Sequence, residues 1–259
     1  MTIRQPVKGA AAFSKTIAVL QLIADSMQPP TSVELVKKTG MPRPTMRRIL
    51  KALIAEDMVQ LQQDKTYVLG ARNIELARKA IDQNGLLRVI DPDLAWLSEQ
   101  SEATVYLGIP NGAEFIFIAG EDNEVQVGKN GPYHACPVAK SYLANVSKDR
   151  REQIVRSIGM PSFTQYTPQN SDELLLELDQ VLQAGYAVSD QQLKLGLKGF
   201  GACISDASQS PCGGIGFMKP VAQLNPDQES NLVAMLLKCR DRINQNLSKA
   251  NYNRPQRSI

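Results

Sequence analysis

The chain has 259 residues, of which 43% are hydrophobic and 21% are charged, a composition ordinary for a globular protein and a length sufficient for two domains. Its net charge of +3 is unevenly divided, because residues 1–80 carry 13 Lys/Arg against 6 Asp/Glu, whereas residues 81–259 carry 16 against 20. A basic first third indicates a nucleic-acid contact at that end of the molecule. The sequence shows no apolar run long enough for a membrane span and no secretory signal, which predicts a cytoplasmic protein without membrane contact.

The first elements in chain order are two helices behind a short N-terminal arm. Residues 1–12 are expected to be disordered, and residues 14–25 to form a helix with Ile17 on its buried side. Thr31 and Glu34 have the spacing of a capping box, in which each side chain accepts the backbone N–H of the other residue. A second helix is therefore predicted to begin there.

Gly40 is a natural end for this second helix, and the turn that follows it leads into a helix with a basic outer face. Over residues 45–53 apolar side chains recur at the i, i+3, i+4, i+7 spacing of a buried stripe, and the basic side chains lie largely off it. Two short helices with a basic second helix are what a helix-turn-helix needs to read a DNA major groove. The predicted DNA-binding residues of this segment are Arg43, Thr45, Arg47, Arg48 and Lys51.

A polar hairpin follows the basic helix. Residues 58–62 and 66–69 read as strands on either side of a turn, and Lys65 in that turn is placed to contact a DNA phosphate. Three helices and a hairpin predict a winged helix-turn-helix DNA-binding domain over residues 1–70. Its expected partner is a double-stranded DNA operator.

Residues 71–88 are predicted to form a linker helix and residues 89–252 a second domain. A helix is expected to begin at Pro92, because proline is favoured at the first helical position. A mixture of antiparallel strands and flanking helices predicts an α+β fold for this domain. Strands are expected at residues 103–109, 114–119, 125–127, 186–188, 202–205 and 213–218, with a hairpin turn at residues 110–113 between the first two. Helices are expected at 138–145, 149–158, 171–184 and 226–249.

The ordered combination of these segments resembles the IclR family of bacterial transcriptional regulators from about residue 10 to about residue 250. The resemblance rests on residues 40–50 and 67–70 in the first domain, and on residues 131–144 and 185–188 in the second. It implies a winged helix, a linker helix and a C-terminal GAF-like domain that binds a small effector, assembled as a homodimer or homotetramer. It implies a ligand-responsive regulator, either a repressor or an activator, and not an enzyme.

This chain departs from the family pattern in the region that the resemblance assigns to the effector. Cys136 and Ala139 stand where the family usually has a threonine and a glycine, and Gln191-Gln192 replace part of an acidic run. Positions that hold a small acid by hydrogen bonds in some relatives are therefore apolar or tiny, which predicts a roomier pocket for an aromatic or relatively apolar organic acid. The expected effector-binding residues are His134, Cys136, Pro137, Val138, Ser189, Asp190, Gly199, Phe200, Gly216 and Met218.

Several of these features have alternative interpretations. The basic helix face could simply be solvated, His134 could be a structural residue, and Lys140 could be either a surface charge or a contact for an acidic ligand. The four cysteines match no metal-binding spacing, so reduced thiols without metal or cofactor are expected, with a redox sensor as the alternative. For the whole chain, the alternatives are a small-molecule-binding module or enzyme with an incidental basic domain, and a DNA-binding protein that ignores ligands. The usual hydrolase, phosphate-loop and zinc-protease motifs are absent from the sequence.

Overall fold

The computed structural model describes residues 10–111, 114–120 and 126–254. The chain forms two compact units, Met1–Gln83 and Asn84–Ile259. Each unit has its own hydrophobic core. The predicted disordered arm falls almost entirely on residues 1–9, which lie outside the described residues.

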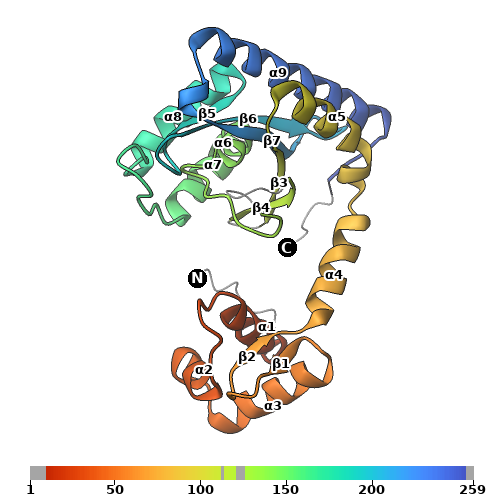
Figure 1. The fold of residues 1–259 in the computed structure, drawn as a ribbon, viewed down its shortest axis with the longest axis vertical. Coiled ribbons are helices and arrows are strands. Elements are labelled where there is room, and N and C mark those ends of the chain that lie inside the picture. Colours follow the sequence, from red (N-terminus) through yellow and green to blue (C-terminus); the bar gives the residue numbers. More distant parts are fainter. Residues whose placement is uncertain (1–9, 112–113, 121–125, 255–259) are drawn as a thin grey trace. The chain divides into compact units, whose positions relative to one another are not determined.

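The first unit contains three helices, a two-stranded sheet and a fourth helix (Figure 1). Its core is made of buried side chains from the three helices and the first strand, among them Val19, Leu35 and Met46. The predicted capping box is present, since the Thr31 side chain accepts the Glu34 N–H and the Glu34 side chain accepts the Thr31 N–H. The elements are α1 (Ala11–Ala24), α2 (Ser32–Thr39), α3 (Arg43–Ala55), β1 (Val59–Leu61), β2 (Tyr67–Leu69) and α4 (Ala71–Asp82).

Strands β1 and β2 pair antiparallel and form the wing. The segment before α2 extends this small sheet, because the Tyr67 N–H donates to the Pro30 carbonyl oxygen at 2.9 Å and Thr31 bridges Thr66. The wing is thereby tied to the start of the helix-turn-helix. Three helices with a wing of this kind form the winged helix-turn-helix fold that the sequence predicts.

The structure corrects two details of this unit. Helix α1 begins at Ala11 and buries Val19 and Ile23, while Ile17 is 42% exposed. Ile17 lies two residues from Val19, about 200° around a helix, so the two side chains cannot share the buried face. Helix α3 begins at Arg43, with Pro44 in its first turn, where a missing N–H costs no helical hydrogen bond.

The second unit is built on a five-stranded antiparallel sheet with the strand order β4-β3-β7-β6-β5. The strands are β3 (Val105–Asn111), β4 (Glu114–Ala119), β5 (Ala187–Asp190), β6 (Leu197–Ser205) and β7 (Pro211–Pro220). The helices are α5 (Gly85–Ser101), α6 (Pro137–Asn145), α7 (Lys148–Ser157), α8 (Ser171–Ala184) and α9 (Pro226–Lys249), and Val221–Gln223 forms a 3-10 turn. Sheet and helices together give the expected α+β domain.

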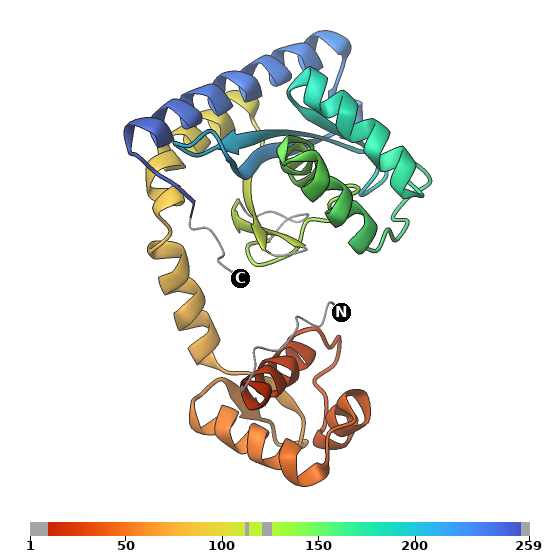
Figure 2. The ribbon, with the colours of Figure 1, turned by 180° about the vertical axis from the view of Figure 1, so that it is seen from behind.

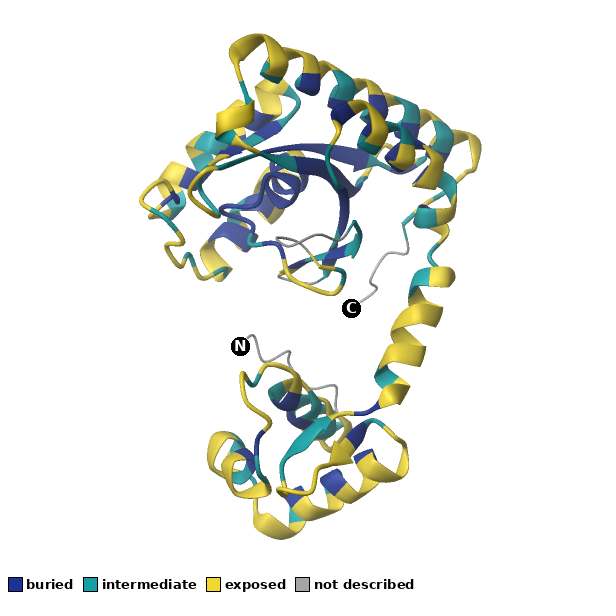
Figure 3. Ribbon diagram, viewed as in Figure 1, coloured by how far each residue is buried: buried dark blue, intermediate teal, exposed yellow. Residues whose placement is uncertain are grey.

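Helices cover both faces of the sheet (Figures 1 and 2). On one face, α5 and α9 bury a hydrophobic cluster that includes Leu97, Leu236 and Ile204. On the other face, α6 lies against the sheet and α8 packs behind it. Helix α6 is buried along nearly its whole length, which Figure 3 shows as a continuous dark segment in the centre of the unit.

Glycines of β6 and β7 allow α6 to lie unusually close to the sheet. A Cβ atom on Gly201 would lie 2.4 Å from the backbone carbonyl of Pro137, and one on Gly216 would lie 2.7 Å from the Val138 side chain. Contacts under 3 Å are not tolerated by a real Cβ, so the sheet needs glycine under this helix. The start of α6 is therefore fixed by backbone contact with the strands.

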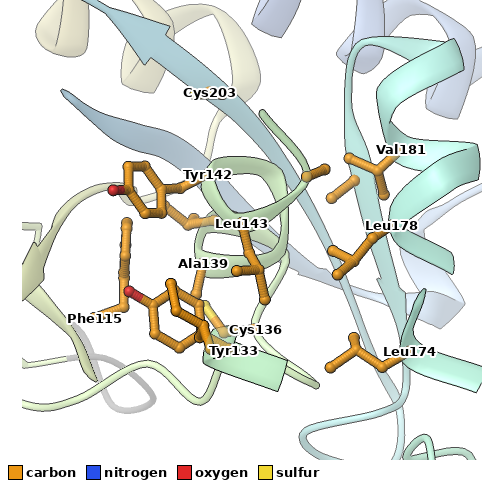
Figure 4. Packing of buried hydrophobic residues seen from close by; sticks show 14 of the residues in the cluster. Phe115, Tyr133, Cys136, Ala139, Tyr142, Leu143, Leu174, Leu178, Val181 and Cys203 are labelled. Atoms are coloured by element: carbon orange, nitrogen blue, oxygen red, sulfur yellow. The ribbon is translucent and has the colours of Figure 1, made fainter. Parts of the chain in front are cut away.

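Helix α6 has aromatic packing on the side of β4 and aliphatic packing on the side of α8 (Figure 4). The ring of Phe115 lies 5.9 Å from that of Tyr133 and 5.7 Å from that of Tyr142. Leu143 of α6 is fully buried and is directed toward α8 in Figure 4. This packing fixes one helix against the other.

Three expectations for this unit need correction or fall outside the description. Helix α5 does not begin at Pro92 but runs through it from Gly85. Its apolar side packs against α9 and the sheet, and this burial outweighs the roughly 3 kcal/mol that an internal proline costs a helix. Gln126 and Val127 are not in a strand, and Val125 lies outside the described residues, as does half of the predicted turn between β3 and β4.

Candidate nucleic-acid interface and ligand cavity

Helix α3 presents a row of cations on its solvent side. Met46, Leu50 and Leu53 face the core, and the side of the helix turned away from them carries exposed Arg47 and Arg48. The exposed basic residues of α3 are Arg43, Arg47, Arg48 and Lys51, and Thr45 between them is half-buried.

The basic side chains of α3 differ from those of α4 in their salt bridges. In the described part of the chain, no Asp or Glu forms a salt bridge with any of the basic side chains of α3. On α4, by contrast, Arg72 and Lys79 both pair with Glu75, and Arg78 pairs with Asp82. The positive charge of α4 is compensated within the helix, whereas that of α3 is available for an anionic partner.

The wing adds a further cation. Lys65 is exposed at the β1–β2 turn and has a φ of 64°. The neighbouring Asp64 accepts hydrogen bonds from the backbone and hydroxyl of Thr66, which fix the turn. These hydrogen bonds hold the pKa of the Asp64 carboxyl below its usual value. The rigid turn therefore holds Lys65 outward at the wing tip.

The second unit contains a cavity of about 230 Å³ between the start of α6, the sheet and the loop that joins β5 to β6. Its walls are mainly apolar, and Lys129 and Lys194 are exposed cations at its border. An apolar chamber with cations at its edge suits a ligand that combines an apolar body with an anionic group. The lining residues are Tyr106, Phe117, Lys129, Asn130, Gly131, Pro132, Cys136, Pro137, Val138, Leu193, Lys194, Leu197, Phe217 and Met218.

Four of the ten residues expected to contact an effector line this cavity, namely Cys136, Pro137, Val138 and Met218. Gly199 and Gly216 instead lie under α6, where a side chain would collide with Pro137 or Val138. Phe200 packs on the opposite face with α5 and α9, because successive residues of a strand point to opposite faces. Ser189 is buried outside the lining, and Asp190 forms a surface ion pair with Lys198 at 3.4 Å.

His134 also lies outside the cavity lining. Its Nε2 is 2.9 Å from the Pro161 carbonyl oxygen, and its ring stacks on Phe163 with the centroids 5.4 Å apart. Burial lowers the pKa of His134, and this effect exceeds that of the hydrogen bond to Pro161. These contacts favour the structural interpretation of His134 over contact with a ligand in this cavity.

Lys140 is neither a surface charge nor part of the cavity lining. It is 1% exposed, and its Nζ donates to Glu177 Oε2, to the Val188 carbonyl oxygen and to Gln192 Oε1 at 2.7, 2.7 and 2.6 Å. These three acceptors match the three N–H donors of an ammonium group. No local sequence pattern predicts this arrangement, because the partners lie 37 to 52 residues away along the chain.

The four cysteines are free and buried. Burial raises the pKa of the Cys136 thiol to about 11 and that of both Cys212 and Cys239 to about 12, and it raises the pKa of Cys203 as well. Thiols that are both buried and protonated react slowly. This environment argues against the redox-sensor alternative.

No helix of the described residues is long and apolar enough to cross a membrane. Within those residues, no group of three or more His, Cys, Asp or Glu side chains is arranged to hold a metal ion. The features that remain as functional sites are the basic face of the first unit and the cavity of the second.

Comparison with known proteins agrees with the division into these two units. The family model for the IclR helix-turn-helix domain matches residues 12–63, and the model for the bacterial transcriptional regulator IclR C-terminal domain matches residues 78–245. The transcriptional repressor IclR of Escherichia coli is 24% identical over 236 residues, which cover 88% of this chain and 86% of the repressor. The transcriptional repressor AllR of the same species is 27% identical over 228 residues, with 85% and 84% covered.

Among solved structures, an IclR homologue from Microbacterium hydrocarbonoxydans in complex with 4-hydroxybenzoate shares the fold with a TM-score of 0.74. It is 17% identical, and the match covers 92% of this chain and 100% of the homologue. The two family matches, the full-length relatives and the shared fold lead to one conclusion. The chain belongs to the IclR family of bacterial transcriptional regulators, and it is a DNA-binding regulator.

Proposed function

We propose that this regulator binds operator DNA through α3 and the wing, and that a relatively apolar organic acid controls the binding from the cavity in the second unit. The observation that carries the DNA part is the contrast between the unpaired cations of α3 and the paired cations of α4. Arg43, Arg47, Arg48 and Lys51, with Thr45, face the major groove, and Lys65 contacts a phosphate beside it.

The DNA contact is tested by the salt dependence of binding. A site is first selected from a random double-stranded DNA library, and its affinity is then measured by fluorescence anisotropy at several salt concentrations. We expect log K to fall linearly with log salt, with a slope of about −0.9 for each phosphate neutralised. A small-molecule enzyme or binding module with an incidental basic domain would select no site and show no such slope.

The ligand part rests on the chemistry of the cavity walls. Apolar side chains supply most of the lining, and Lys129 and Lys194 stand where a carboxylate could meet them. The relative that binds 4-hydroxybenzoate supports the same class of ligand, an aromatic acid. A two- or three-carbon acid would leave most of the 230 Å³ unfilled, so apolar contact would contribute little to its binding.

Calorimetry with a small panel tests this assignment. Benzoate and 4-hydroxybenzoate are expected to bind with measurable heat, and glyoxylate and pyruvate are not. Exchange of Lys129 and Lys194 for glutamine should weaken benzoate binding but leave that of the neutral analogue benzyl alcohol unchanged. Binding of pyruvate, or equal loss of both aromatic ligands in the glutamine variant, would contradict the proposed recognition.

The assembly that we propose is a homodimer, or a pair of such dimers, that reads a two-fold symmetric operator. Helix α4 has no buried residue in the single chain and exposes Ile74 and Leu76. Helix α1 of the same unit exposes Phe13 and Ile17. Apolar side chains exposed in this number favour burial against a second copy. Sedimentation analysis of Ile74→Glu should then show dissociation toward the monomer.

A further inference from the structure

The loop between β5 and β6, together with the first residue of β6, forms one wall of the cavity through Leu193, Lys194 and Leu197. The loop closes on itself, because the Gln191 N–H donates to the Leu197 carbonyl oxygen at 2.9 Å and the Gly196 N–H donates to Gln191 Oε1 at 3.1 Å. The end of the loop is held at the sheet, because Leu197 belongs to β6 and the Val221 N–H donates to the Gly196 carbonyl oxygen at 2.9 Å. The position of Leu193 relative to α6 then depends on what fixes the residues just before it.

Two side chains, Lys140 of α6 and Glu177 of α8, hold Gln192 among the first residues of the loop. Lys140 Nζ donates to Gln192 Oε1 at 2.6 Å, and Gln192 Nε2 donates to Glu177 Oε1 at 2.9 Å. Glu177 in turn accepts from Lys140, so the three side chains form a closed ring of hydrogen bonds. All three N–H donors of Lys140 are used, so the hydrogen bonds fix the position of its Nζ atom. The hydrogen bond from this atom in turn fixes the side chain of Gln192.

The outer side of the same segment is held by a second loop. Thr164 Oγ1 donates to the Gln191 carbonyl oxygen and Thr167 Oγ1 to the Gln192 carbonyl oxygen, both at 2.7 Å. The segment is thus clamped from both sides at residues 191–192, directly before the first cavity-lining residue of the loop.

Helix α6 connects this clamp to the opposite wall. Cys136, Pro137 and Val138 at its start line the cavity, and Lys140 follows them within one turn. One rigid helix therefore supplies a wall of the cavity and, through Lys140, the anchor for the loop that faces this wall. The hydrogen bond from Lys140 to Gln192 thus links the two walls directly.

We propose that Lys140, Glu177 and Gln192 are positioning residues that set the width of the ligand cavity and so determine which ligands fit it. The assignment rests on the proposed function of the cavity. Lys140, Glu177 and Gln192 do not line the cavity themselves, so they affect its width only through the loop.

The variant that isolates this role is Gln192→Met. Methionine keeps the length of the side chain but cannot accept from Lys140 or donate to Glu177, and the buried ion pair of Lys140 and Glu177 remains intact. Gln183→Met, an exposed position of α8, is the matched control. Lys140→Met combined with Glu177→Met removes the other two members of the ring without leaving a buried unpaired charge.

The first measurement needs no ligand. Trypsin cleavage after Lys194, which is exposed, reports how often the loop opens. We expect Gln192→Met to accelerate this cleavage about tenfold, while cleavage after Arg156 in α7 and the behaviour of Gln183→Met stay unchanged. A cleavage rate equal to that of the unaltered chain would overturn the proposal, whatever the cavity binds.

The second measurement is the affinity for benzoate and for the bulkier 2-naphthoate. A wider cavity should weaken benzoate binding about tenfold and change that of 2-naphthoate less, so the ratio of the two affinities shifts in Gln192→Met. A merely structural role would lower the melting temperature and leave this ratio unchanged, which would overturn the proposal. If neither acid binds the unaltered chain, the proposed ligand class fails, and the trypsin result alone decides the role of the clamp.

Discussion

Gly201 and Pro137 lie so close that a Cβ atom on the glycine would come within 2.4 Å of the proline carbonyl carbon and oxygen. The contact joins the centre of the sheet to the first residue of α6. It is a contact between two backbones, so neither side can yield by changing a rotamer.

Gly201→Ala is therefore expected to destabilise the protein. Either α6 or β6 must move, and the overpacking costs about 3 kcal/mol in the free energy of unfolding. Urea denaturation measures this value. Gly159→Ala is the control, since nothing lies within 4 Å of a Cβ there and its stability should be unchanged. A stable Gly201→Ala protein would show that the close approach is not required.

Leu143→Ala tests the packing of α6 against α8. Leu143 is fully buried opposite Leu174 and Leu178 of α8, which are also fully buried, so its truncation leaves a cavity in the core (Figure 4). The expected loss is about 2–5 kcal/mol by urea denaturation. Exposed Leu176 on α8 provides the comparison, and Leu176→Ala should have little effect.

His134 makes stability depend on pH. Its pKa is lowered by burial, so the unfolded chain binds a proton more readily than the folded one. The contribution is fully present above the unfolded pKa of about 6.5 and is lost as the pH falls through the lower folded pKa. Because His134 is the only histidine, thermal unfolding between pH 7 and pH 5 reports on it directly.

The matching variant is His134→Gln, whose amide can still donate to the Pro161 carbonyl oxygen. The variant should show a flatter stability profile between pH 7 and pH 5 than the unaltered chain. An identical slope in both proteins would mean that another group is responsible.

Arg48 and Lys65 should affect DNA binding in different ways. Loss of an arginine that reads a base costs about 1–3 kcal/mol and relaxes the preference for that base, whereas loss of a phosphate contact lowers the salt slope by about one and weakens all sequences alike. Anisotropy titrations of Arg48→Ala and Lys65→Gln distinguish these patterns. Arg78→Ala, which removes a cation paired with Asp82 on α4, should leave binding unchanged.

The sequence predicts local structure well where the determinants are local. The Thr31–Glu34 capping box and the end of α2 at Gly40 are present, and α8 has the predicted bounds of residues 171–184. The prediction that a helix begins at Pro92 was wrong, because α5 is stabilised by packing against side chains of a distant helix and the sheet. The prediction that Ile17 is buried was wrong, because several faces of α1 carry apolar side chains. The sequence does not show which of these faces packs against α2 and α3.

Only part of the cavity lining could be predicted from the sequence, because the rest depends on contacts between distant residues. Of the four predicted residues that line it, Cys136, Pro137 and Val138 form one continuous segment, and Met218 lies on β7. The loop residues that face them, and the anchoring of that loop by Lys140, arise from contacts across 37 to 52 residues of sequence. A lysine in an amphipathic helix gives no local sign that its side chain is directed inward.

The burial of all four cysteines has a practical consequence. Because the native thiols are shielded and protonated, maleimide dyes should leave the folded chain unlabelled without any cysteine having to be replaced. One cysteine introduced at exposed Leu195, in the loop beside the cavity, would then carry a single fluorophore. Its emission would follow the movement of that loop in real time, in the otherwise natural sequence.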